Sequence, residues 1–173
     1  FAILGTEEKC CGDSARRLGN EYLAQMLIDS NIETMRKYSF KRIVTACPHG
    51  YNALKVEYPQ FGFEAEVLHH SELLLELIRE GKLKNLSVEQ SSGIYHDSCY
   101  LGRYNDIIDQ PRDLLGSIRG VELREFDRKK KRSFCCGAGG GRMWLEETAG
   151  ERINESRVDE ALAEGAGQIF TAC

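Results

Sequence analysis

The alternation of apolar and polar residues predicts short strands separated by amphipathic helices. Apolar or β-branched runs bounded by loop residues predict strands, and apolar residues that recur every three or four positions predict helices. The predicted strands are residues 1–4, 41–46, 65–68, 93–96, 121–126 and 168–172. The predicted helices are residues 14–38, 48–57, 71–80, 106–118 and 142–164. Strand and helix alternate along the whole chain, which is the pattern of an α/β fold.

The helix predicted over 14–38 sets the expected geometry of the first half. Its apolar stripe, which we expect to be buried, consists of Leu18, Tyr22, Met26, Ile28, Ile32 and Met35. Together with the strands at 1–4 and 41–46 it would form a βαβ unit, in which the strands are parallel and the crossover is right-handed. The second half repeats the order of elements. We therefore predict two Rossmann-like βαβ repeats with largely parallel sheets.

Two phrases of sequence occur twice in the same order. Cys10-Cys11-Gly12 recurs as Cys135-Cys136-Gly137, and Thr45-Ala46-Cys47 recurs as Thr171-Ala172-Cys173. The offsets are 135 − 10 = 125 and 173 − 47 = 126, so the two segments form an internal repeat. The expected division is a first copy over 1–86, incomplete at its start, a linker over 87–93, and a second copy over 94–173, truncated at its end.

The cysteines fall next to the ends of predicted strands. Cys10 and Cys11 lie between the first strand and its helix, and Cys47 follows the second strand. The carboxyl ends of parallel strands meet at one sheet edge, where open α/β sheets bind ligands, so these three residues should converge. The positive end of the following helix should favour their thiolates. By the same argument the second copy should bring together Cys99, Cys135, Cys136 and Cys173.

The composition of the chain indicates which kinds of binding partner and which cellular compartment to expect. The chain has 23 basic and 27 acidic residues and a net charge of −4, which argues against nucleic-acid binding. No apolar run approaches the roughly 18 residues that span a bilayer, and residues 1–4 are too short for a signal core. Seven cysteines, clustered in adjacent pairs, fit metal ligation in a reducing compartment better than a secreted disulfide framework. We expect a cytoplasmic protein.

Four thiolates at one sheet edge suit either an iron–sulfur cluster or zinc. Zinc sites usually use closely spaced cysteine pairs, and this chain contains no Cys-x-x-Cys. Adjacent cysteines also suit neighbouring irons better than one tetrahedral ion. Zinc, a disulfide between distant cysteines, and buried structural thiols stay as alternatives.

Several residues beside the cysteines are candidates to support the site. The glycines from Gly137 to Gly141 should let the backbone approach a bulky cluster closely, and they fit a dinucleotide fingerprint poorly. Arg142 follows the second Cys-Cys-Gly as Arg16 follows the first, and either could offset thiolate charge or lie on a helix surface. Histidines near strand ends would line the sites, supply protons or hydrogen bonds, or satisfy buried backbone groups. They are His49, His69, His70 and His96.

The spacing around Cys-Cys-Gly resembles that of a known family. In the second copy, 35 residues separate Cys99 from Cys135, and 36 separate Cys136 from Cys173. With the phrases at 45–49, 95–103 and 135–140, this pattern is similar to the cysteine-rich CCG domain found in the B-type and D-type subunits of heterodisulfide reductase. The phrases look closest to heterodisulfide-reductase-like oxidoreductases associated with electron-transfer flavoprotein and quinone. The resemblance implies one or two 4Fe–4S clusters, of the non-cubane type in heterodisulfide reductase, with all seven cysteines as ligands.

The resemblance also implies a function. A module of this kind relays electrons between a flavoprotein, such as electron-transfer flavoprotein or an FAD dehydrogenase subunit, and a quinone-linked or thiol acceptor. Disulfide reduction directly at the clusters is one alternative, and a zinc-binding or metal-free interaction module is another. Membrane association, on the cytoplasmic face, would come only through segments outside this chain. Gly50 stands where the family often has a cysteine, so the second copy is expected to be the better cluster site.

Overall fold

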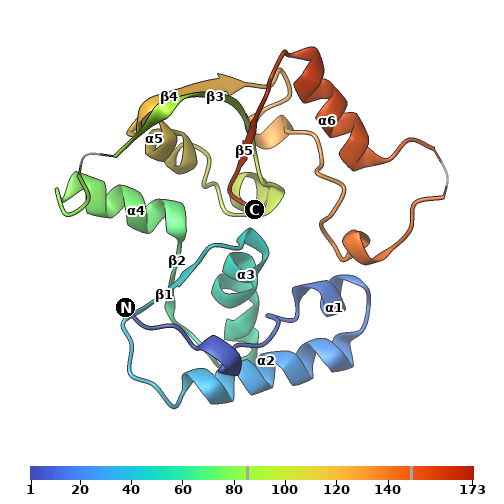
Figure 1. Ribbon diagram of the computed structural model, residues 1–173. Coiled ribbons are helices and arrows are strands. Elements are labelled where there is room, and N and C mark those ends of the chain that lie inside the picture. Colours follow the sequence, from blue (N-terminus) through green and yellow to red (C-terminus); the bar gives the residue numbers. More distant parts are fainter. Residues whose placement is uncertain (85, 149) are drawn as a thin grey trace.

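The computed structural model describes residues 1–84, 86–148 and 150–173 and shows helices alternating with strands (Figure 1). The helices are α1 (Asp13–Arg17), α2 (Glu21–Met35), α3 (Pro48–Asn52), α4 (His70–Arg79), α5 (Gln110–Gly116) and α6 (Ile153–Ala163). The strands are β1 (Arg42–Thr45), β2 (Glu66–His69), β3 (Ser87–His96), β4 (Arg119–Glu125) and β5 (Ile169–Thr171). Short 3₁₀ and π turns connect several of them. The predicted α/β class is confirmed.

The strands form two separate parallel sheets. In the first, β1 pairs with β2 from Arg42 opposite Glu66 to Thr45 opposite His69. In the second, β3 lies between β4 and β5, in the order β4-β3-β5. The end of β5 leads to the C terminus, which lies in the middle of the molecule next to α3 (Figure 1). This places the end of the second copy against the first copy.

Residues 1–4 do not form the predicted strand. Phe1 and Ile3 are exposed, and the segment pairs with no strand in the described part of the chain. The side chain of Leu4 instead packs against the buried cluster that includes Ile28 and Ile32 of α2. The first sheet, as described, therefore consists of β1 and β2.

The long helix predicted over 14–38 is interrupted. Gly19 has a φ of +84°, a left-handed conformation that ends α1, and Asn20 starts α2 by accepting a hydrogen bond from the Leu23 amide at 3.1 Å. Leu18 lies before this break, and Tyr22 and Met26 lie on the face of α2 opposite the buried Ile28. Leu18, Tyr22 and Met26 are exposed, so the prediction that they are buried was wrong.

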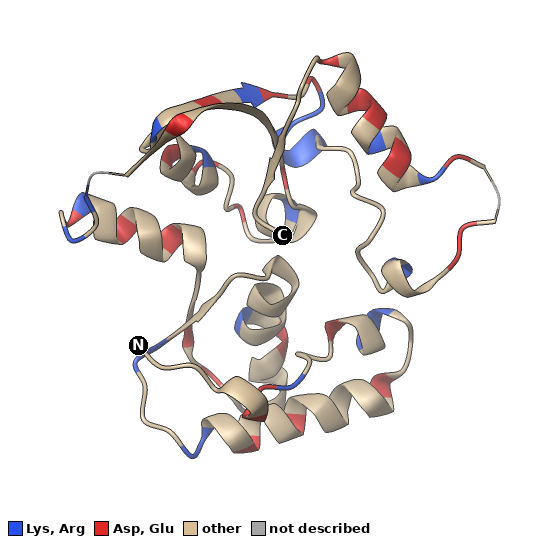
Figure 2. Cartoon of the chain, viewed as in Figure 1, with Lys and Arg blue, Asp and Glu red and all other residues tan. Residues whose placement is uncertain are grey.

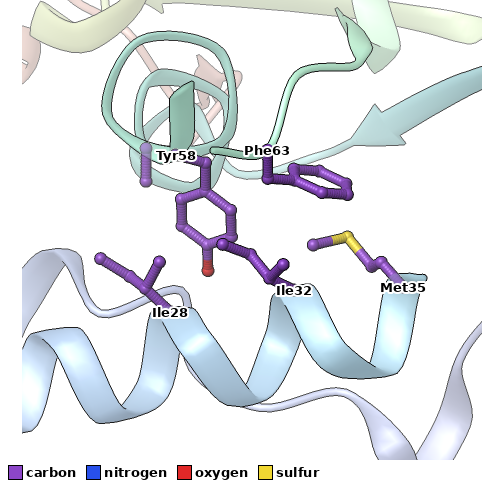
Figure 3. Packing of buried hydrophobic residues seen from close by; sticks show 6 residues of the cluster. Ile28, Ile32, Met35, Tyr58 and Phe63 are labelled. Carbon is purple, nitrogen blue, oxygen red and sulfur yellow. The ribbon is translucent and has the colours of Figure 1, made fainter. Parts of the chain in front are cut away.

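The later part of the stripe is buried as predicted. Ile28, Ile32 and Met35 of α2 point toward Tyr58 and Phe63, which lie on the segment between α3 and β2 (Figure 3). Ile28 is only 1% exposed. This cluster fixes α2 beneath the first sheet and thereby the loop that carries Cys10 and Cys11.

Three boundaries in the second half differ from the prediction. The helix predicted over 142–164 is a 3₁₀ turn, η6 (Arg142–Trp144), followed by α6, because Gly150 with a φ of +74° lies between them. Residues 87–93, expected as a linker, form the first part of β3. Pro111 sits in the first turn of α5, where proline is tolerated, and the helix predicted from 106 begins there instead.

The two copies share a core. One buried cluster contains residues of both copies, namely Tyr51, Val67, Leu101, Ile107 and Ala172. Acidic and basic residues are interspersed over most of the helices, whereas α3 and β5 contain no Lys, Arg, Asp or Glu (Figure 2). None of the helices that the structure describes is both long and apolar enough to cross a membrane.

Candidate metal centre

Four cysteines line one pocket at the carboxyl edge of the second sheet. Cys99 follows β3, Cys135 and Cys136 lie in the glycine-rich loop, and Cys173 follows β5. The other lining residues are His49, His96, Asp97, Ser98, Arg103, Ser133 and Phe134. The structure thus brings together the second predicted set of cysteines, and it adds one residue from the first copy, His49.

The arrangement of the thiols bears on what they can hold. All seven cysteines are free. Among the described residues, no three His, Cys, Asp or Glu side chains close in on one point as ligands of a single ion do. Sulfurs around one tetrahedral zinc would lie about 3.8 Å apart, given Zn–S bonds of about 2.3 Å. Four thiols spread around a pocket fit a multi-atom iron–sulfur cluster.

Backbone amides point at two of these sulfurs. The Gly137 amide donates to Sγ of Cys135 at 3.3 Å, and the Ala138 amide donates to Sγ of Cys136 at 3.5 Å. Gly137 has a φ of +81°, and a Cβ atom there would lie 2.9 Å from the Asn154 nitrogen. Only glycine fits this position without a shift. The loop therefore supplies N–H donors that favour the thiolate form.

A buried chain of hydrogen bonds reaches Cys136 from α6. The Arg157 Nε donates to Nδ1 of His96 at 3.1 Å, which leaves the Nε2–H of His96 to donate to Cys136. This hydrogen bond is the main reason that the pKa of Cys136 is lowered to about 7. The Arg157 guanidinium also stacks 3.3 Å from the centroid of the Phe126 ring. No local pattern in the sequence points to Arg157, because only tertiary packing brings it to His96.

The other thiols have different environments. Burial raises the pKa of Cys99, and the charges of Cys136 and Cys135 raise it further, while nearby Arg103 opposes them. Burial raises the pKa of Cys11 to about 12. The backbone of Asp13 at the start of α1 lowers the pKa of Cys11, in the direction expected for a helix N terminus, but desolvation outweighs it.

The first set of cysteines lies outside the pocket of the second set. Cys10 and Cys47 lie near enough to Cys11 for their charges to raise its pKa further. The Gly50 amide donates to Sγ of Cys47 at 3.5 Å. Cys10 and Cys47 are exposed, and none of the three lines the pocket of the second set. The first copy thus gathers three thiols near one another.

His49 connects the two copies. Its Nδ1–H donates to Oδ2 of Asp13 at 2.8 Å, and Oδ1 of the same carboxylate accepts from the Tyr100 hydroxyl at 3.2 Å. His49 also hydrogen-bonds to Cys173, and these two contacts, Asp13 foremost, raise its pKa to about 10. We call these residues the Asp13–His49–Tyr100 network. The network links Asp13, which lies two residues after Cys11, to Tyr100, which directly follows Cys99.

The two arginines predicted near the clusters have other partners. Arg142 pairs with Glu147, and Arg16 donates to Glu57 at 2.8 Å. Neither of them lines the pocket. Arg103, which sequence reasoning did not single out, lines it and donates to the Ser133 carbonyl in the segment before Cys135.

A protein-family model matches the segments of the chain that contain these cysteines. The cysteine-rich domain family, CCG, matches residues 1–55 and 94–173, which is more than half of the chain. The chain belongs to this family. The matched segments contain both Cys-Cys-Gly phrases and all seven cysteines. The predicted resemblance is confirmed.

Several relatives are named as oxidoreductases or as a subunit of one, and one of them is named as iron–sulfur-binding. The chain is 51% identical to the probable iron-sulfur-binding oxidoreductase FadF of Bacillus subtilis and 51% identical to the EtfAB:quinone oxidoreductase of Syntrophomonas wolfei. It is 36% identical to one subunit of the dihydromethanophenazine:CoB–CoM heterodisulfide reductase of Methanosarcina barkeri. All of this chain is matched, against 24%, 25% and 44% of those proteins. No solved structure matches it.

Proposed function

We propose that the chain is an iron–sulfur electron-transfer module of a heterodisulfide-reductase-like oxidoreductase. The observation that carries this proposal is the pocket lined by Cys99, Cys135, Cys136 and Cys173. A 4Fe–4S cluster held there would accept and release single electrons. The names of the relatives support the same chemistry.

The residues of the chain would prepare the site before a cluster binds. Thiolates are the form that ligates iron, so each ligand must lose its proton. His96 and the Ala138 amide lower the pKa of Cys136 to about 7, so that about half of this thiol is a thiolate at pH 7. The Gly137 amide donates to Sγ of Cys135, and the absence of a side chain at Gly137 leaves room for the approach of a bulky group. A second cluster, held by Cys10, Cys11 and Cys47, would have one protein ligand fewer.

The partners follow from the relatives and are part of the proposal. One relative is named as an EtfAB:quinone oxidoreductase, which favours an electron-transfer flavoprotein as donor and a quinone-linked acceptor. The chain spans about a quarter of that protein, so the activity would belong to a larger assembly in the cytoplasm or at a membrane face. Within the chain, the division into copies at 1–86 and 94–173 stays a prediction.

The proposal is tested by analysing iron, sulfide and zinc in protein prepared without oxygen, with electron paramagnetic resonance on the same samples. The variants are Cys135→Ser and Cys10→Ser, one in each set. We expect Cys135→Ser to lose iron and sulfide, and Cys10→Ser to lose only the share held by the first set. Zinc without iron and sulfide, or equal iron in wild type and Cys135→Ser, would contradict the proposal.

Disulfide reduction is a second candidate. Cys135 and Cys173 line the pocket and are also exposed, so a thiol or disulfide has access to their side of the site. A relative is named as part of a heterodisulfide reductase. Turnover of a disulfide by the loaded protein with a low-potential electron donor would favour this candidate. Cluster reduction without turnover would favour a relay.

A further inference from the structure

His69 lies in the core between the two copies. It is the last residue of β2 and is fully buried. Its Nε2 lies 3.3 Å from the carbonyl oxygen of Ala46, and the backbone of Ala172 lies close enough to the ring to raise the pKa of His69, as that of Ala46 does. Ala46 and Ala172 occupy equivalent positions in the repeated phrase Thr-Ala-Cys. A single side chain therefore contacts the same peptide in both copies.

The ring nitrogens of His69 have distinct roles. Nδ1 faces the Ser71 hydroxyl at 2.8 Å and the Ser71 amide at 3.4 Å, so Nδ1 accepts. The proton of a neutral ring then belongs to Nε2, which donates to the carbonyls. Burial, helped by the charge of His70, lowers the pKa of His69 to about 4, which keeps the ring neutral. Capping of α4 uses Nδ1, so it does not account for the contacts of Nε2.

The two peptides that His69 contacts are also held on their other side. The Cys47 amide donates to the Thr45 hydroxyl at 3.2 Å, and the Cys173 amide donates to the Thr171 hydroxyl at 3.2 Å. In each case the carbonyl that faces His69 and the amide that faces threonine belong to one planar peptide unit. These contacts thus fix the backbone from which the side chains of Cys47 and Cys173 extend.

We propose that His69 is a positioning residue for Cys47 and Cys173, because its shared Nε2–H joins the Ala46 and Ala172 carbonyls at the ends of β1 and β5. The consequence for cluster binding rests on the proposed function. The contact itself is independent of it, since it exists between protein groups alone. His69 would set the positions of one ligand in each set at the same time.

The contact is tested first in cluster-free wild-type protein, by nuclear magnetic resonance with ¹⁵N-labelled histidine. At pH 7 His69 should be the neutral tautomer with a slowly exchanging proton on Nε2. A cationic ring, or a proton on Nδ1, would overturn the proposal. This measurement needs no variant, so it does not depend on how any variant folds.

The variants then test positioning. His69→Phe keeps a ring but has no N–H, and His69→Gln keeps an N–H donor. His70→Phe is the matched control, because His70 stacks on His69 with centroids 4.2 Å apart, and its buried Nδ1 has no partner among the described residues. In cluster-free protein, His69→Phe should shift the backbone ¹⁵N resonances of both Cys47 and Cys173, with His69→Gln closer to wild type. A shift of neither, or equal shifts in His70→Phe, would refute the inference.

The loaded protein provides an independent readout. Removing a group that orients metal ligands typically costs about 10-fold to 100-fold in affinity. We expect His69→Phe to lose iron to a chelator at least about 10-fold faster than wild type, and His70→Phe to match wild type. Unchanged iron loss in His69→Phe would refute positioning. If wild-type protein binds no iron, the proposed function fails, and the cluster-free spectra alone decide whether His69 joins the two peptides.

Discussion

The reactivity of Cys136 should depend on His96. In cluster-free protein, His96→Phe removes the hydrogen bond that contributes most to lowering the pKa of Cys136 to about 7, from an ordinary 9.0. At pH 7 the thiolate fraction would fall from about one half to about one hundredth, or roughly 50-fold. A thiolate of higher pKa is intrinsically more nucleophilic, by about 8-fold for two units at a Brønsted coefficient of about 0.45. The net expectation is reaction about 6-fold slower at pH 7.

The assay is thiol–disulfide exchange with glutathione disulfide, followed at the Cys136 peptide by mass spectrometry across pH. In wild type the rate should rise with a midpoint near pH 7, and in His96→Phe the midpoint should move upward, toward the ordinary 9.0. His70→Phe makes the same chemical change away from the pocket and should leave the midpoint in place. A midpoint that stays near 7 in His96→Phe would show that the loop amides alone stabilise the thiolate.

Four further predictions concern stability and iron content. Because the folded-state pKa of His69 is about 4, below its unfolded value of 6.5, its contribution to stability is complete above pH 6.5 and is lost toward pH 4. Urea unfolding should therefore show a loss of about 2 kcal/mol between pH 7 and pH 5 that His69→Gln lacks. Ile28→Ala should cost about 2–5 kcal/mol in the same assay, because the side chain is buried beneath Tyr58. Gly137→Ala should lose about 1–2 kcal/mol from backbone strain and bind less iron than Gly140→Ala, the control at a left-handed glycine with open space around it. Gly50→Cys should raise iron per chain under anaerobic conditions, since its Cβ would lie at an ordinary 3.7 Å from that of Cys47; unchanged iron would show that the missing fourth cysteine does not limit iron binding by the first set.

Much of the architecture could be predicted from the sequence because its signals are local. Strands such as Arg42–Thr45 and Glu66–His69 are short β-branched or apolar runs, and the duplicated phrases fix how the copies correspond. The pocket follows from one rule of topology, that the carboxyl ends of parallel strands meet at one edge. That rule places Cys99 and Cys173 together without any knowledge of side-chain contacts. Their role as cluster ligands stays a prediction.

The features that sequence reasoning missed depend on contacts between distant residues. Arg157 reaches His96 across 61 positions, and Tyr100 reaches Asp13 across 87, so no local spacing indicates either pair. The interruption after α1 was missed for another reason. A glycine inside a periodic apolar stripe is compatible with a continuous helix, and only the left-handed conformation of Gly19 ends it.

The Asp13–His49–Tyr100 network shows one way in which the two copies of the repeat differ. Duplication reproduces every residue, yet position 138, which lies 125 positions after Asp13, is Ala138. The carboxylate therefore exists once, and it serves a histidine of its own copy and a tyrosine of the other. A chain with two identical halves would place a second acid beside Cys136, where added negative charge opposes a thiolate. Because the two copies differ at this position, each supplies a residue that the other lacks, and one copy could not replace the other.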